Sequence, residues 1–232
     1  MSAGLELLAD RADAELAGLP SGNRNGVLMA LGDVSSERRQ PLVRWLDRPV
    51  RPQERHQELV IAPAGEGLWR RAPWPAADAL FDLPPASAAP PLLVGSEPGL
   101  RDAVAERAAA RGVSMRQAER LDAAGLAGAG CVVLAESPGG ALPSRAFAVL
   151  AAGRLLIAPR LRTTFGLEDA LDHLEFADPD EAVTAAQAFA ADPETFGRVV
   201  AWGRLKAEQQ RASVVYARLA EDLRLQGLAG GA

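Results

Sequence analysis

Cysteine, histidine and aromatic residues are scarce in this chain, and each scarcity excludes a class of protein. The chain has one cysteine, Cys131, which excludes an internal disulfide framework, and its place in an apolar run predicts a buried, inert thiol. Two histidines and that cysteine make no metal-ligand cluster. Aromatic residues make up 5% of the chain and alanine is abundant, which favours helices packed on a sheet over an aromatic-rich β-sandwich.

Long apolar runs and clusters of basic residues are missing as well. No run approaches the ~20 apolar residues that span a bilayer, so we expect no membrane span. The formal net charge is −5 and arginines stand singly or in pairs such as Arg38-Arg39, which argues against nucleic acid as a partner. Four acidic residues among the first 19 argue against a signal peptide. We therefore expect a soluble, cytoplasmic protein.

With 232 residues, of which 48% are hydrophobic, the chain is long enough for one large domain or two small ones. Prolines crowd residues 69–91 around one short apolar segment, residues 79–81. This composition predicts a linker with a docked turn, and we place a domain boundary there. Residues 1–74 would form an abbreviated N-terminal α/β region, and residues 75–232 the main domain. The alternative is a surface loop within a single domain.

In the first region, two apolar runs predict strands at residues 26–32 and 59–63. Apolar residues near helical spacing predict an amphipathic helix over residues 5–19. Ser35 or Ser36 is suited to cap a short helix through residues 42–46. Two strands are few for an independent domain.

The second region is organised around residues 131–159, which read as strand, glycine-containing loop, helix and strand. The expected segments are a strand at 131–135, a helix at 143–152 and a strand at 155–158. A βαβ unit of this kind belongs to a parallel sheet with a right-handed crossover. Ligands of such sheets bind beyond the carboxyl ends of the strands, so the loop 136–144 is our first candidate for a binding site.

The remaining segments extend this unit to an α/β fold, a Rossmann-like parallel sheet with helices on both faces. Asp178-Pro179 and Asp192-Pro193 each combine a capping aspartate with proline at the first helical position. We expect a strand at 92–95, a helix at 98–111, a strand starting at 113, a helical or irregular segment at 121–130, a strand at 174–176 and helices from 178 and 195. The last helical pattern continues to residue 225, with Leu205, Val215, Leu219 and Leu223 facing inward.

Candidate ligand contacts follow from the position of the strand ends. Arg145, in the first turn of the central helix, would bind a phosphate, or would be solvated or bridge Glu136. Ser144 would cap that helix or donate to a phosphate. The other candidates are Gly95 and Ser96 after the first strand of this region, Glu136, Ser137, Gly139 and Gly140 in the central loop, and Arg160 and Thr163 after the next strand.

Several segments in order resemble the C-terminal, nucleotide-sugar-binding half of GT-B glycosyltransferases, of the "glycosyltransferase family 1" and spore-maturation-like type. The clearest is residues 142–157, LPSRAFAVLAAGRLLI. It resembles the family's helix, which carries proline, arginine and phenylalanine at alternate positions near its start and is followed by an apolar strand. The similarity covers roughly residues 70 to 225. The other matching segments are LVGS at 93–96, Phe165-Gly166, DPDEA at 178–182, DPE at 192–194 and AWGR at 201–204.

The resemblance implies transfer of a sugar from a nucleoside diphosphate donor, with no metal and no further cofactor. The diphosphate would lie at the start of the central helix, and His56 from the first region would be a candidate base. Two departures oppose this reading. The family usually has an acid that binds the ribose where this chain has Ala148, and residues 1 to about 70 are few for the acceptor-binding half.

The resemblance therefore leaves two alternatives. In the first, the chain is a transferase whose cleft is completed by a second chain, either another copy or a protein partner. In the second, it is a catalytically silent relative that serves as a binding or scaffold protein.

Overall fold

The computed structural model describes residues 15–18, 73–84, 89–138, 145–161 and 164–225, and before residue 73 also the backbone of five short strands. These residues form two separate five-stranded sheets. The first contains β1 (Leu7–Leu8), β2 (Leu28–Leu31), β3 (Leu42–Trp45), β4 (Leu59–Ala62) and β5 (Arg70–Arg71), all parallel and in sequence order.

The first sheet corrects two predictions for this region. The short helix expected at residues 42–46 is wrong, because β3 is a strand hydrogen-bonded to β2 on one side and β4 on the other. The helix expected over residues 5–19 is wrong at residues 7–8, where β1 lies, whereas residues 15–17, the other described part of that range apart from Gly18, are helical. The strands expected at 26–32 and 59–63 are confirmed by β2 and β4. Strand pairing with distant segments overrides the local pattern at β1 and β3.

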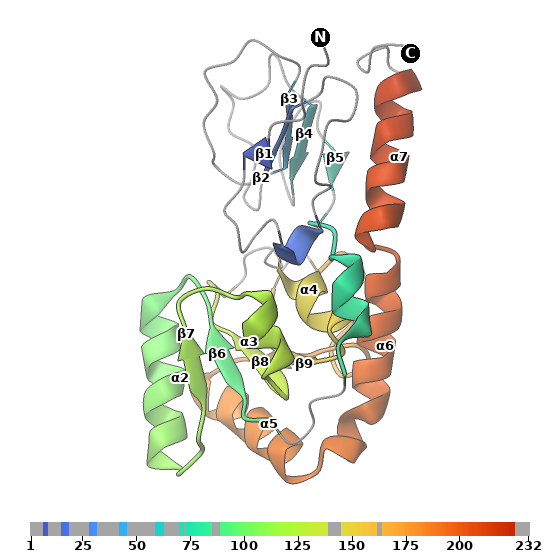
Figure 1. The fold of residues 1–232 in the computed structure, drawn as a ribbon. Helices are drawn as coiled ribbons and strands as arrows, with labels where there is room; N and C mark the ends of the chain where they lie inside the picture. Colours follow the sequence, from blue (N-terminus) through green and yellow to red (C-terminus); the bar gives the residue numbers. More distant parts are fainter. Residues whose placement is uncertain are drawn as a thin grey trace.

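The second sheet has the strand order β7-β6-β8-β9-β10, again with every pair parallel. The chain forms β6 first, moves outward to β7, and then returns to the other side of β6 to form β8, so the strand order reverses between β6 and β8 (Figure 1). The strands are β6 (Leu92–Val94), β7 (Arg116–Ala118), β8 (Cys131–Leu134), β9 (Leu155–Pro159) and β10 (Leu174–Phe176). The predicted Rossmann-like α/β fold is confirmed for this sheet.

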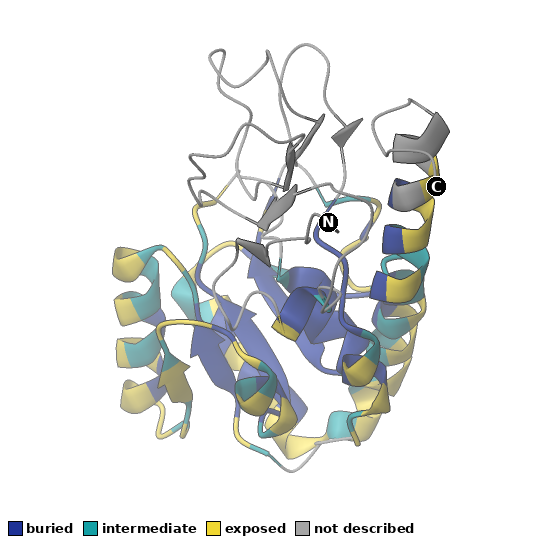
Figure 2. Cartoon of the chain, turned by 45° about the horizontal axis from the view of Figure 1, so that its top comes forward, coloured by how far each residue is buried: buried dark blue, intermediate teal, exposed yellow. Residues whose placement is uncertain are grey.

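Both faces of the second sheet are covered, as the apolar run of each central strand requires. Leu93, Val133 and Ile157 pack under α2 (Pro98–Ala110) and α5 (Pro179–Ala191). The alternate residues of the same strands pack on the opposite face, under α3 (Ala123–Ala127) and α4 (Ala146–Ala151). The residues of β6, β8 and β9 are all buried, and Figure 2 shows this buried centre of the sheet and the exposed outer faces of the helices.

Most predicted boundaries in this region hold to within a few residues. The strand expected to start at residue 113 begins at Arg116, because the Val113 N–H donates to the Ala108 carbonyl (2.8 Å) and closes α2. The two capping aspartates are confirmed: Asp178 accepts from the Glu181 N–H at the start of α5, and Asp192 from the Thr195 N–H.

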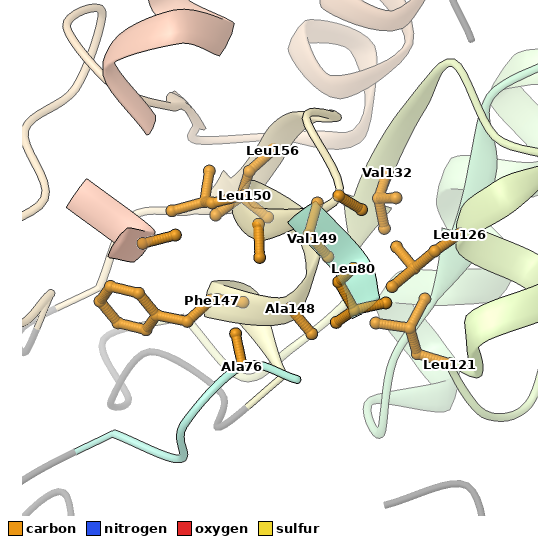
Figure 3. Close-up of a cluster of buried hydrophobic side chains, with 14 of the residues drawn as sticks. Ala76, Leu80, Leu121, Leu126, Val132, Phe147, Ala148, Val149, Leu150 and Leu156 are labelled. Atoms are coloured by element: carbon orange, nitrogen blue, oxygen red, sulfur yellow. The ribbon is translucent and has the colours of Figure 1, made fainter. Parts of the chain in front are cut away.

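Helix α4 is buried on every side, since all six of its residues are buried. The proline-rich segment before β6 contains the 3₁₀-helix η2 (Asp78–Asp82). Its Leu80 and Phe81 are buried in the same core cluster as α4. Figure 3 shows Leu80 and Ala76 beside Ala148 and Val149 of α4. The predicted docked turn is therefore confirmed, and it seals the outer side of α4. The domain division at residue 74 stays a prediction.

The C-terminal helical segment is divided into α6 (Gly197–Glu208) and α7 (Ala212–Leu225). Ala76 of the linker pairs with the chain at the break, accepting from the Ala212 N–H and donating to the Gln210 carbonyl, each at 2.8 Å. The single long helix and the inward position of Leu205 are wrong, because Leu205 is 56% exposed. Leu219 is buried and Val215 half-buried, whereas the side chain of Leu223 lies outside the described residues.

Residues 15–18 join the linker and α7 at one place. The Ala77 N–H donates to the Leu16 carbonyl (2.8 Å), and the hydroxyl of the buried Tyr216 donates to the Ala17 carbonyl (3.0 Å). Gly18 has a φ of +59°, and an added Cβ there would lie 2.7 Å from the Ala77 Cα. Three segments far apart in the sequence are thus packed closely where the chain passes from the first sheet to the second.

Candidate functional site

The strongest position for a site is the carboxyl end of β6 and β8, where the strand order reverses. In open α/β sheets a reversal of this kind opens a crevice beyond the carboxyl ends of the two strands, because the two connections leave on opposite faces of the sheet. Two short turns follow these strands, residues 95–97 after β6 and residues 135–138 after β8. Figure 1 shows that these strand ends point toward the first sheet.

The backbones of the two turns are held in close contact. The Ala135 N–H donates to the Val94 carbonyl (2.8 Å), and the Glu97 N–H donates to the Ala135 carbonyl (3.1 Å). A Cβ at Gly95 would lie 2.0 Å from the Ala135 oxygen, so only glycine permits this approach. Gly95 thus allows the turn after β6 to lie against the turn after β8, and its contact with a ligand stays a prediction.

Side chains cross between the same two turns in both directions. The Ser96 hydroxyl donates to Glu136 Oε2, and the Ser137 hydroxyl donates to Glu97 Oε2 (3.0 Å). Three of these residues were predicted, and the structure brings Ser96, Glu136 and Ser137 together. Glu97 was missed. Its signal in the sequence was an acid directly after a strand and directly before Pro98, the first residue of α2.

This arrangement is rich in hydrogen-bond acceptors. An ionised carboxylate offers about four lone-pair sites, so a carboxylate that accepts one serine hydroxyl can also accept hydroxyls from a ligand. Two carboxylates together repel a bare phosphate and favour a ligand that presents several hydroxyl groups, such as a ribose or a hexose. The pair of turns is therefore suited to bind a polyhydroxylated molecule.

Two cationic side chains belong to neighbouring segments. Arg145 directly precedes α4 and is half-buried. Arg160 follows β9, is 77% exposed, and places its Nε 3.5 Å from Glu175 Oε2. Because the Arg160 side chain is largely exposed, solvent screens this pair on one side, and a ligand anion can compete with Glu175 for Arg160.

The remaining predicted contacts separate into two groups. Gly139, Gly140, Ser144, Thr163 and His56 lie outside the described residues. Ala148, the position at which the sequence departs from the glycosyltransferase pattern that it resembles, is 2% exposed and packs in the core cluster of α4 (Figure 3). An acid at that position of this fold would be buried in the same cluster.

Other classes of site have no basis in the described part of the chain. Within it, no group of three histidine, cysteine or acidic side chains is arranged to hold a metal ion. None of the helices described is both long and apolar enough to cross a bilayer. Cys131 is buried, as predicted, and burial raises the pKa of its thiol to about 12.

Comparison with protein families and curated proteins assigns this chain to no family. No protein-family model matches it, and no curated protein matches it either. Its function must therefore be inferred from the strand order and from the side chains at the carboxyl edge of the second sheet.

Proposed function

We propose that the protein binds a nucleoside diphosphate sugar at the carboxyl ends of β6 and β8 and transfers the sugar to an acceptor. The observation that supports this most is the reversal of strand order directly beneath the Ser96–Glu136 and Ser137–Glu97 pairs. Doubly wound sheets bind nucleotides at such a reversal. The resemblance of residues 70–225 to a nucleotide-sugar-binding domain supports the same class of ligand.

Each side chain has a role in this proposal. Glu97 and Glu136 accept hydroxyls of the ribose or the sugar, which carboxylates do more strongly than neutral acceptors. Arg145 and Arg160 contact the diphosphate from the starts of neighbouring connections. Cations fixed beside the leaving diphosphate stabilise its negative charge as the glycosidic bond breaks, and such preorganised charge is usually the largest contribution to catalysis. The acceptor would approach from the side of the first sheet, toward which these strand ends point (Figure 1).

A thermal-shift panel of nucleoside diphosphates and their sugars tests binding. A ligand at about 100 times its Kd adds about 2.7 kcal/mol to the stability of the fold, which corresponds to several degrees for a chain of this size. We expect a shift with one base, reduced in Glu136→Gln and in Arg145→Ala. Glu106→Gln, on the exposed face of α2, removes the same charge outside the site and is the matched control. No shift with any nucleotide would refute the proposal.

Transfer is tested separately from binding, by release of free nucleoside diphosphate from the sugar that gives the largest shift. A transferase releases it slowly by hydrolysis and faster when an acceptor is present. Binding without any release would favour the second candidate, a silent relative that binds a protein partner. That candidate is favoured by Trp202 and Leu205, which are exposed together on α6, as residues three apart on a helix lie on one face.

A further inference from the structure

A second group of charged side chains lies in the loop between β9 and β10. It contains Asp172 and His173, which are 0% and 1% exposed. The His173 Nδ1 lies 3.0 Å from Asp172 Oδ1, and the other ring nitrogen, Nε2, lies 3.8 Å from Glu175 Oε1. Glu175 in turn reaches Arg160, which follows β9 and is one of the two proposed anion contacts.

The hydrogen bonds fix the tautomer of His173. Asp172 Oδ1 accepts from His173 Nδ1 and from the Glu168 N–H (3.0 Å), so a neutral imidazole carries its proton on Nδ1. The bare Nε2 then faces a carboxylate, and two acceptors cannot bond to each other. In agreement, Nε2 and Asp172 Oδ2 are buried without a hydrogen-bond partner among the described residues.

The loop is held in this geometry by more than the histidine. Phe165 and Ala170 have φ values of +54° and +60°, which non-glycine residues adopt only when surrounding contacts enforce them. The Ala170 N–H donates to the His173 carbonyl (2.8 Å), and the Phe165 ring packs edge-on against Phe147 of α4. Backbone and ring contacts within residues 164–173 therefore support the position of His173 between two carboxylates.

The charges that face the loop come from each element packed against it. Its own residues supply Asp172, the exposed Glu168 and Asp169, whose carboxylate accepts from the Glu175 N–H (2.8 Å). The strands supply Glu175 and Arg160. Helix α6 packs Gly203 against the Asp172 carbonyl. Of the cations on α6, Lys206 donates to the Gly166 carbonyl of this loop (3.0 Å), and Arg204 donates to the Phe81 carbonyl outside it.

We propose that His173 is a proton-sensitive control on Arg160, acting through Glu175. When His173 is neutral, Glu175 has no donor on its histidine side and its charge is directed at Arg160. When His173 takes up a proton, Nε2–H becomes a donor for Glu175, and the local charge rises by one unit beside Arg160. Both effects strengthen the attraction of Arg160 for an anion, so the protein would bind its anionic ligand more tightly at lower pH. This inference rests on the proposed anion contact of Arg160.

Sulfate is the probe for this control, because its charge is constant over the range in which histidine titrates. Its binding is followed on the Arg160 Nε–H signal by NMR, assigned with Arg160→Gln. We expect wild type to bind sulfate at least about fivefold more tightly near pH 6 than near pH 8, in line with ordinary coupling between sites. His173→Gln should abolish that difference. If the pH dependence persists in His173→Gln, the proposal is overturned.

Glu175→Gln gives a second test that does not depend on replacing a buried residue, since Glu175 is 16% exposed. It should bind sulfate tightly at both pH values, because Arg160 loses its partner. Glu168→Gln, in the same loop and with the same loss of charge, should behave as wild type. Equal behaviour of the two variants would contradict a role for Glu175.

The tautomer gives a readout that a merely structural histidine would not share. The chain has two histidines, so His56→Gln leaves one imidazole whose nitrogen shifts report His173 alone. A protonated Nδ1 and bare Nε2 near pH 8 are expected, and the opposite tautomer would refute the control. If no nucleotide binds but the sulfate effect and its loss in His173→Gln remain, the proposed function fails and the control stands. If a nucleotide binds with the same affinity at both pH values, the proposed function stands and the control by His173 fails.

Discussion

Gly95 allows the turns after β6 and β8 to touch, so Gly95→Ala should separate them. The added Cβ would lie 2.0 Å from the Ala135 oxygen, and the two turns would have to move apart by about 1 Å to reach the 3.0 Å below which such contacts hardly occur. That movement strains or breaks two backbone hydrogen bonds, from Ala135 to Val94 and from Glu97 to Ala135. Each is worth about 0.5 to 1.5 kcal/mol, and overpacking adds about 1 to 3 kcal/mol.

We therefore expect Gly95→Ala to lower the free energy of unfolding by about 3 kcal/mol, a fall in Tm of roughly 6 to 12 °C for a chain of this length. Differential scanning calorimetry measures the shift. Gly99→Ala is the matched control, because a Cβ at that position in α2 meets nothing closer than Glu97 Oε1 at 3.8 Å. Alanine favours a helix by about 0.5 to 1 kcal/mol over glycine. Equal Tm values for the two variants would refute the close packing of the turns.

Three further predictions test the packing around the site. Burial raises the pKa of Tyr216, the one tyrosine of the chain; because the raised pKa belongs to the folded state, the stabilisation is complete below about pH 10, the unfolded value, and is lost as pH rises above it. Phenolate absorbance should thus appear together with the loss of circular dichroism, and phenolate in a still-folded protein near pH 10 would contradict this burial. Asp178→Ala removes the cap of α5 and should cost about 1 kcal/mol, measured as Tm, whereas Glu106→Ala should change little; equal Tm values would rule the cap out. Arg154 donates to the Leu126 and Pro84 carbonyls (2.9 and 3.0 Å), so Arg154→Met should lower the free energy of unfolding by about 2 to 4 kcal/mol, measured with denaturant. The control Arg101→Met, at a half-exposed arginine, should cost under 1 kcal/mol. A similar loss in both variants would contradict a stabilising role for the two Arg154 hydrogen bonds.

Local signals in the sequence predicted the second sheet well. The apolar runs of β8 and β9, the helix between them and the capping Asp178 each act within a few residues, and each was found where expected. The docked turn at η2 was also visible, because prolines isolate its apolar residues. What these elements share is that the determining contacts are close in sequence.

The errors arose where distant contacts decide the outcome. β3 was predicted as a helix from a capping serine and a short apolar run, but pairing with β2 and β4 makes it a strand. The division of the last helix depends on Ala76, more than a hundred residues earlier. Leu205 then lies on the exposed side of α6. No local pattern contains these contacts.

The site was predicted in part for the same reason. Its place beyond β8 follows from the βαβ pattern, whereas the strand order that makes β6 its neighbour appears only in the fold. The bonds between Ser96 and Glu136 and between Ser137 and Glu97 each join residues 40 apart in sequence. Glu97 consequently had no visible partner in the sequence.

The most direct test of the proposed function is a calorimetric titration with the nucleoside diphosphate sugar that gives the largest thermal shift. Wild type, Glu136→Gln and the control Glu106→Gln are compared at one pH and salt concentration. Hydrogen bonds to a charged group contribute about 1.5 to 3 kcal/mol, so Glu136→Gln should weaken binding by tenfold or more, while Glu106→Gln should match wild type. Equal affinity in all three proteins, or no binding by wild type, would contradict a nucleotide-sugar site at the ends of β6 and β8.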